Sequence, residues 1–140
     1  LFFRILTRRC DLAMAIRLLY KEKEMPLVEA VSLYEQAFRS SLLKDEIKVI
    51  NSRLRYKEPA HEDTTDWRSL DNNLFFTKAY MRIFSSPEIA VWIAYECLLL
   101  ILKKARSGVT DDLQIFTYNR RKFWVKAEGK HIVFLTPEDY

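Results

Sequence analysis

Glycine is scarce in this chain, and its scarcity excludes two kinds of nucleotide site. Among the 140 residues, only Gly108 and Gly129 are glycines. Dinucleotide-binding fingerprints and phosphate loops need several glycines, because the backbone amides must approach the phosphate closely. We therefore expect neither kind of site in this protein.

Cysteine and histidine are also rare. The two cysteines, Cys10 and Cys97, cannot form a four-thiolate zinc site and are too few for a disulfide scaffold. The two histidines, His61 and His131, leave little for a metal site or a catalytic triad. We expect no metal and no cofactor, and a reducing, cytoplasmic compartment.

The chain has no long uninterrupted apolar run. The longest spans residues 89–102 and contains Glu96, whereas a transmembrane helix needs about 20 mostly apolar residues. This run is typical of a buried core helix. The sequence therefore predicts no membrane partner.

What the chain does have is positive charge, unevenly distributed. Residues 1–58 carry 12 basic and 8 acidic side chains, residues 59–102 carry 3 and 6, and residues 103–140 carry 8 and 5. A polyanion would be attracted to the two basic outer segments. An ordinary, slightly basic surface explains the same numbers equally well.

Helical periodicity dominates the first three quarters of the chain. Apolar spacing predicts helices over about residues 3–23, 26–38, 42–56, 70–84 and 88–105, with a loop over residues 57–66. Two β-type runs, residues 123–125 and 131–135, flank a turn at residues 128–130, and residues 111–118 form a short helix or a strand. We expect a mainly α-helical fold, in which a helical domain over residues 1–106 contains a helix-turn-helix at about 26–56. A small β-hairpin belongs to a C-terminal extension over residues 107–140.

The helix predicted over residues 42–56 is amphipathic. Its apolar face carries Leu43, Ile47, Ile50 and Leu54, and a parallel polar stripe carries Lys44, Lys48, Asn51 and Arg55. In a helix-turn-helix the second helix enters the major groove of double-stranded DNA. There the three cations would reach phosphates or guanine edges, and Asn51 would pair with adenine. A solvated face of a helical bundle is the alternative interpretation.

A second basic cluster lies near the C-terminal hairpin. Arg120, Arg121 and Lys122 are adjacent and precede Phe123 and Trp124. Three neighbouring cations at the mouth of a hairpin form a plausible phosphate clamp. We therefore add these three residues to the candidate DNA contacts.

Five stretches follow one another along the chain in a recognisable order. They are residues 11–15 (DLAMA), 41–54 (SLLKDEIKVINSRL), 65–67 (TDW), 74–80 (LFFTKAY) and 88–95 (EIAVWIAY). Their order resembles the FlhC-type subunit of the flagellar master transcriptional activator, whose relatives also control conjugative transfer genes. The family closes with a four-cysteine zinc module, whereas residues 113–135 contain no cysteine here.

The resemblance implies a function and partners. The expected function is that of a DNA-binding transcriptional activator subunit, acting in a hetero-oligomer with a smaller FlhD-like partner and contacting RNA polymerase. The missing cysteines imply a metal-free hairpin held together by packing of Phe123, Trp124 and Phe134.

Two alternatives from other classes stay open. One is a helical protein-interaction domain, such as an inhibitor or adaptor from a mobile element, that does not bind DNA. The other is a small enzyme that uses His61 together with Asp63 or Asp66. No nucleophile stands beside a base in a recognisable signature, so our prediction is that the protein is not an enzyme.

Overall fold

The computed structural model describes residues 12–41, 44–57, 63–104 and 109–139. Within them the helices are α2 (Leu12–Lys21), α3 (Leu27–Ser40), α4 (Lys44–Asn51), α5 (Lys78–Met81) and α6 (Pro87–Lys104), with short 3-10 helices η1 (Trp67–Ser69) and η2 (Pro137–Asp139). The strands are β1 (Leu54–Lys57), β2 (Thr64–Asp66), β3 (Leu74–Phe76), β4 (Val109–Asp111), β5 (Leu113–Tyr118), β6 (Arg121–Glu128) and β7 (His131–Leu135).

The main sheet joins strands from distant parts of the chain. Over the described residues it has five strands in the order β1-β5-β6-β7-β3, while β2 and β4 form a separate two-stranded sheet. Neighbours in the main sheet are antiparallel, except that β3 runs parallel to β7. Buried and partly exposed residues alternate along β5 and β6, which is typical of a sheet with one face on the core.

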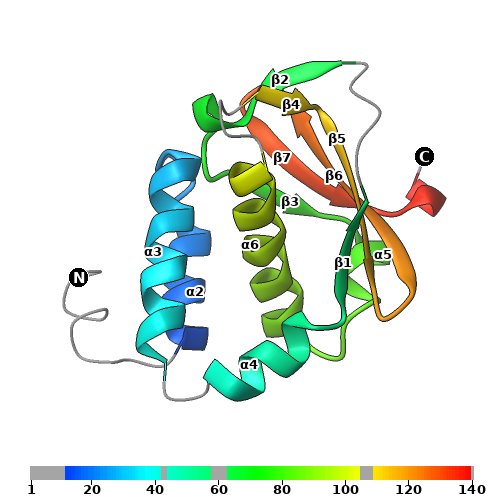
Figure 1. Ribbon diagram of the computed structural model, residues 1–140. Coiled ribbons are helices and arrows are strands. Elements are labelled where there is room, and N and C mark those ends of the chain that lie inside the picture. The colour runs from blue at the N-terminus through cyan, green and yellow to red at the C-terminus, as the bar shows by residue number, and fades with distance from the viewer. Residues whose placement is uncertain (1–11, 42–43, 58–62, 105–108, 140) are drawn as a thin grey trace.

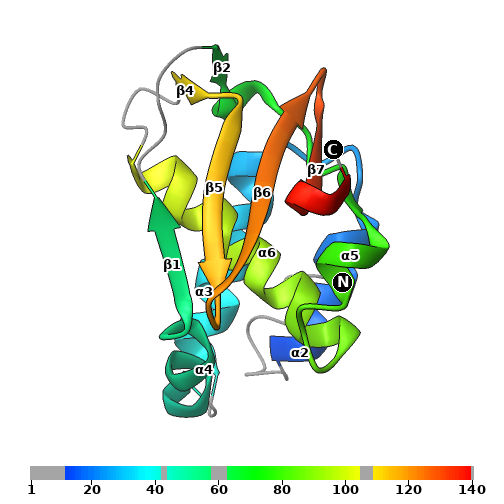
Figure 2. The same cartoon turned by 90° about the vertical axis from the view of Figure 1, so that its right-hand side faces the viewer.

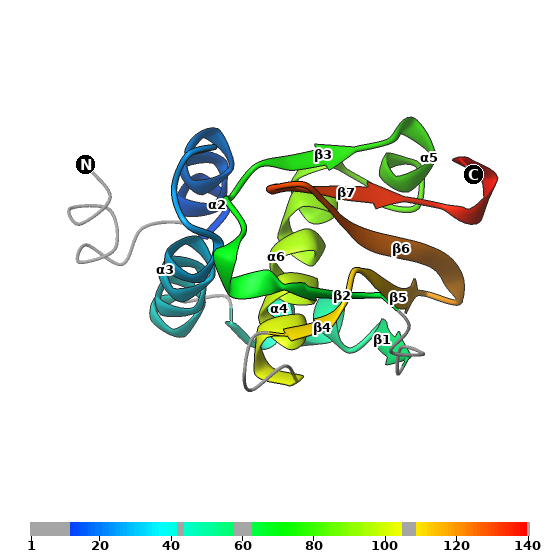
Figure 3. The same ribbon diagram turned by 90° about the horizontal axis from the view of Figure 1, so that it is seen from above.

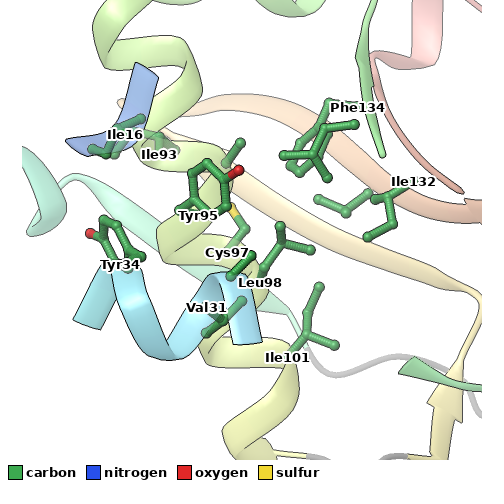
Figure 4. Close-up of a cluster of buried hydrophobic side chains, with 14 of the residues drawn as sticks. Ile16, Val31, Tyr34, Ile93, Tyr95, Cys97, Leu98, Ile101, Ile132 and Phe134 are labelled. Atoms are coloured by element: carbon green, nitrogen blue, oxygen red, sulfur yellow. The ribbon is translucent and has the colours of Figure 1, made fainter. Parts of the chain in front are cut away.

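Helix α6 forms the centre of the fold. Figure 1 shows it between the pair α2–α3 on one side and the main sheet on the other. Because it is covered on both sides, its sequence is apolar nearly all round. Figure 4 shows the resulting core, in which Ile16 of α2 and Val31 of α3 lie near Ile93 and Leu98 of α6, while Phe134 comes from β7.

A buried asparagine ties these layers together. The Nδ2 atom of Asn72 donates to the carbonyl oxygens of Leu19, at 2.7 Å, and Glu22, at 3.2 Å. Its Oδ1 accepts from the hydroxyl of Tyr95, at 2.9 Å. Asn72 is fully buried, so every one of these bonds replaces a bond to water.

The predicted fold class, mainly α with a small C-terminal hairpin, is wrong. The C-terminal residues form the middle of a mixed sheet, β5-β6-β7, whose outer strands β1 and β3 come from the half expected to be helical. The turn at residues 128–130 is found where the sequence predicted it, between β6 and β7. The helix predicted over residues 70–84 is instead strand β3 followed by the four-residue helix α5.

The second helix of the predicted helix-turn-helix is shorter in the structure than the sequence predicted. Helix α3 and helix α4 do follow one another, but α4 is eight residues long and ends at Asn51. Leu54–Lys57 then forms strand β1, which pairs with β5. Arg55 therefore lies on a strand rather than on a recognition helix. Ile47 and Leu54 are buried as expected, while Leu43 lies outside the described residues.

Candidate nucleic-acid interface

The two basic clusters predicted from the sequence lie beside each other in the structure. Strand β1 begins just after α4 and pairs with β5, with Leu54 opposite Tyr118. A two-residue turn then leads from Tyr118 into Arg121 of β6. Across this junction the backbone amide of Asn119 donates to the carbonyl oxygen of Arg53, at 3.1 Å. We call the surface formed here the cationic edge, and it comprises Lys48, Arg53, Arg55, Arg120, Arg121 and Lys122.

Part of the cationic edge is a row across three strands. Arg55 of β1 is opposite Thr117 of β5, and Thr117 is opposite Lys122 of β6. Side chains in one row share a face, and two strand spacings separate Arg55 from Lys122 by about 10 Å. Figure 2 shows the three strand ends side by side above α4. Both cations are exposed, on the face opposite α6.

Arg121 extends from the other face of the sheet. It is opposite Tyr118, whose side chain is buried. The Nη1 atom of Arg121 donates to the carbonyl oxygen of Arg82, just after α5, at 3.4 Å. The cationic edge thus presents positive charge on both sides of the β5–β6 turn.

The turn itself has an unusual backbone. Asn119 and Arg120 have φ values of 49° and 69°. Two-residue hairpins of this left-handed type favour Asn followed by Gly, because a Cβ atom is strained at positive φ. Asparagine tolerates the conformation, whereas arginine at the second position does so at an energetic cost. The turn places an exposed cation at its tip at the expense of local strain.

None of the six cationic side chains forms an ion pair with a carboxylate of the described residues. The guanidinium of Arg55 instead donates through Nη1 to the carbonyl oxygen of Leu54, at 3.0 Å, and also to that of Ser52. These bonds hold Arg55 over the end of α4. Asp45, exposed on α4, is the acidic side chain one turn before Lys48. Among the described side chains at this edge, the cations therefore outnumber the carboxylates.

Two predicted contacts require separate comment. The side chain of Lys44 lies outside the described residues. Asn51 is half-buried, and its Oδ1 is shielded from solvent without a hydrogen-bond partner among the described residues. Its amide lies beside the hydroxyl of Tyr34 and acts to lower the pKa of that group, against the larger effects of burial and of Glu96. Asn51 thus faces the interior, whereas Lys48 faces solvent.

The sequence analysis missed Arg53 and Arg82. Arg53 lies between Asn51 and Arg55 in the sequence, but in the predicted helix it is not on the polar stripe that these two residues share. Arg82 has no neighbouring basic residue in the sequence, and only the contact with Arg121 brings it to the edge. Such a juxtaposition leaves no local signal.

Two carboxylates, those of Asp66 and Glu96, have structural roles here. Asp66 accepts from the backbone amide of Arg68, at 3.1 Å, and so caps η1. Glu96 accepts from the hydroxyl of Tyr34, at 2.6 Å, and burial raises the pKa of its carboxyl. His61 lies outside the described residues. No group of three or more His, Cys, Asp or Glu among the described residues is arranged to hold a metal ion.

An apolar groove runs between α2 and the first half of α6. It has a volume of about 210 Å³, and Ile16, Tyr20 and Trp92 contribute to its walls. At its rim Arg17 and Glu88 form an exposed ion pair of 3.1 Å. The groove offers apolar contact rather than charge, so its chemistry differs from that of the cationic edge.

Comparison with known proteins leaves the family open. No family model, curated protein or solved structure matches this chain. In the part of the chain that the structure describes, no helix is long and apolar enough to cross a membrane.

Proposed function

We propose that the protein binds double-stranded DNA by contacting the phosphate backbone with its cationic edge. The observation that carries the proposal is the junction of β1 with the β5–β6 turn, where Asn119 donates to the carbonyl of Arg53. It brings cations from residues 48–55 and 120–122 to one edge of the molecule, on both sides of the β5–β6 turn, and none of them is paired with a described carboxylate. Uncompensated cations are what a polyanion selects.

The arrangement favours binding to the backbone over reading of bases. Phosphate contacts fix the position and orientation of a protein on DNA and carry no sequence information themselves. Helix α4 is short, and Asn51, the residue expected to read adenine, has its Oδ1 shielded from solvent. We therefore propose that affinity comes from the arginines and lysines of the edge. The narrower role, a transcriptional activator subunit with an FlhD-like partner and RNA polymerase, rests on the family resemblance alone.

A salt-dependent titration tests the proposal. Fluorescence anisotropy of a labelled duplex at several salt concentrations gives the slope of log K against log salt, which is about −0.9 per phosphate contact. Six engaged cations would give a slope near −5 by this rule. The test variants are Lys48→Gln, Arg53→Gln and Arg120→Gln, each of which should reduce the steepness of the slope by about 0.9.

The matched control is Lys130→Gln. Lys130 is exposed, follows Gly129 in the β6–β7 turn, and therefore lies at the opposite end of β6 from Arg120. The Lys130→Gln variant loses one positive charge from a similar turn. If the effect on binding came from net charge alone, this variant would reduce the steepness of the salt slope as much as the test variants do. If all four variants gave the wild-type curve, the cationic edge would be ordinary solvated surface. The protein-interaction alternative, with the apolar groove as its feature, would then take precedence.

A further inference from the structure

A hollow adjoins the cationic edge on the side of α5. Its volume is about 260 Å³, and it lies between α5, the first residues of β6 and the segment that follows β7. Figure 2 shows η2 in front of the β6–β7 hairpin and α5 on the same side, and Figure 3 shows α5 beside β7 from above. The polar lining comes from Arg82, Arg121, Lys122, Thr136 and Glu138, and the apolar lining from Ala79, Ile83 and Pro137.

The lining carries two net positive charges, because three cations face a single carboxylate, Glu138. The neighbouring carboxylate of Asp139 is already engaged. It accepts from the backbone amide of Thr136, at 2.7 Å, and from the hydroxyl of Thr77, at 2.8 Å. These bonds, with a contribution from Arg82, hold the pKa of Asp139 below its usual range. Asp139 is therefore ionised and, together with Glu138, offsets two of the three cations, so the hollow keeps a net charge of about +1.

The donors of the hollow suit a phosphate group. Two guanidinium groups can each present paired N–H donors, and planar forks of this kind match phosphate oxygens. The bond from Arg121 to the carbonyl of Arg82 holds the two arginine segments together. The hydroxyl of Thr136, at the opposite wall, already donates to the carboxylate of Asp139, at 3.2 Å, so the arginines supply the donors for a ligand. Ala79 and Ile83 provide a wall on which a sugar could pack.

We propose that this hollow binds a phosphomonoester group, either at the 5′ end of a nucleic acid or on a free mononucleotide. A phosphomonoester carries about −1.5 to −2 charges at pH 7 and three acceptor oxygens, so a net positive site with two guanidinium groups attracts it more strongly than a backbone diester, which carries a single charge. A volume just below the range of about 300–1,000 Å³ typical of small-molecule sites suits a phosphate with part of its sugar. Binding at a duplex end rests on the proposed function, but affinity for the phosphomonoester does not.

The first arm of the test needs no DNA. Nucleoside monophosphate is titrated into ¹⁵N-labelled protein, with the unphosphorylated nucleoside as the control ligand and inorganic phosphate as a second probe. The expected result is saturable shifts of the amides of Arg82, Arg121 and Thr136, with none for the nucleoside. The double variant Arg82→Gln/Arg121→Gln should weaken binding by about tenfold or more, while Lys130→Gln should leave it unchanged. Absence of saturable shifts in the wild-type protein would overturn the proposal.

The second arm distinguishes the two sources. Duplexes that differ only in a 5′-phosphate or a 5′-hydroxyl are compared in wild type and in the double variant. If the wild type prefers the phosphorylated duplex and the double variant does not, the hollow binds the 5′ ends of nucleic acids. Binding of the mononucleotide without such a preference assigns it to a free phosphomonoester. If no duplex binds but the mononucleotide does, the proposed function fails and the hollow stands.

Discussion

Replacing Arg120 with glycine should stabilise the fold and weaken DNA binding together. A residue with a Cβ atom pays about 1–2 kcal/mol to adopt the left-handed backbone conformation, and glycine avoids this cost. The added freedom of glycine in the unfolded chain costs about 0.4–1 kcal/mol of this gain. The net effect is an increase of about 0.5–1 kcal/mol in the free energy of unfolding. The φ of 69° at Arg120 is the structural basis of the estimate.

Two measurements on the same variant check this prediction. An unfolding entropy of about 2.1 cal/mol/K per residue gives about 0.3 kcal/mol/K for 140 residues, so the Tm should rise by about 2–3 °C. In the duplex titration, loss of one phosphate contact should reduce the steepness of the salt slope by about 0.9. If the variant is more stable and binds DNA less tightly, then Arg120 serves binding and does not stabilise the fold.

Matched variants of the turn sharpen the comparison. Arg120→Lys keeps both the charge and the strained backbone, so its Tm and its salt slope should stay near those of wild type. Asn119→Gly changes the neighbouring position without changing the charge, and asparagine already tolerates positive φ, so neither property should move much. A lower Tm for Arg120→Gly would refute the strain argument, and an unchanged salt slope would refute the role of Arg120 in binding.

Three further predictions concern stability. Ile47→Ala should lower the free energy of unfolding by about 2–5 kcal/mol in a denaturant titration, because this side chain is 1% exposed and anchors α4 to the core. Asn72→Ala should be comparably destabilising and should increase amide exchange in α2. The substitution leaves the buried Tyr95 hydroxyl without its acceptor, and it removes one of the two donors to the Leu19 carbonyl, which keeps only its bond from the Glu22 amide. Glu96→Gln should raise the free energy of unfolding at pH 7, because burial raises the pKa of the Glu96 carboxyl in the folded state. The wild type therefore loses stability as the pH rises from the unfolded-state pKa of Glu96 through its folded-state pKa. Glutamine does not titrate, so the variant should lack this loss. A wild-type stability that increased over the same pH interval would contradict this assignment for Glu96.

The sequence predicts the long helices well, because their signal is local. The apolar spacing predicted a helix from residue 88 to 105, and α6 spans Pro87–Lys104. The helix predicted over 26–38 corresponds to α3, Leu27–Ser40. For these two helices the periodicity of the apolar residues agrees with the burial in the structure.

The strands at the edges of the sheet could not be predicted in the same way. Leu54–Lys57 continues a helical pattern and becomes β1 because it pairs with β5, about sixty residues later in the chain. Leu74–Phe76 becomes β3 because β7 lies beside it. In both cases nonlocal hydrogen bonds override a weak local preference. The clusters of the cationic edge were identified from the sequence, but their proximity depends on the same nonlocal pairing.

The order of the strands has a consequence for how the protein is made. The two outer strands of the main sheet, β1 and β3, are synthesised early, whereas β5, β6 and β7, which separate them, are synthesised last. Backbone bonds from Asp71 to Lys130, from Ile132 to Asn73 and from Thr77 to Phe134 close this arrangement. A nascent chain that has not yet emerged to residue 135 therefore holds unpaired strands and an apolar α6 with one side uncovered. Exposed apolar surface and unpaired strand edges make a chain prone to aggregation, so we expect a chain that stops within β7 to aggregate rather than to fold in a shortened form.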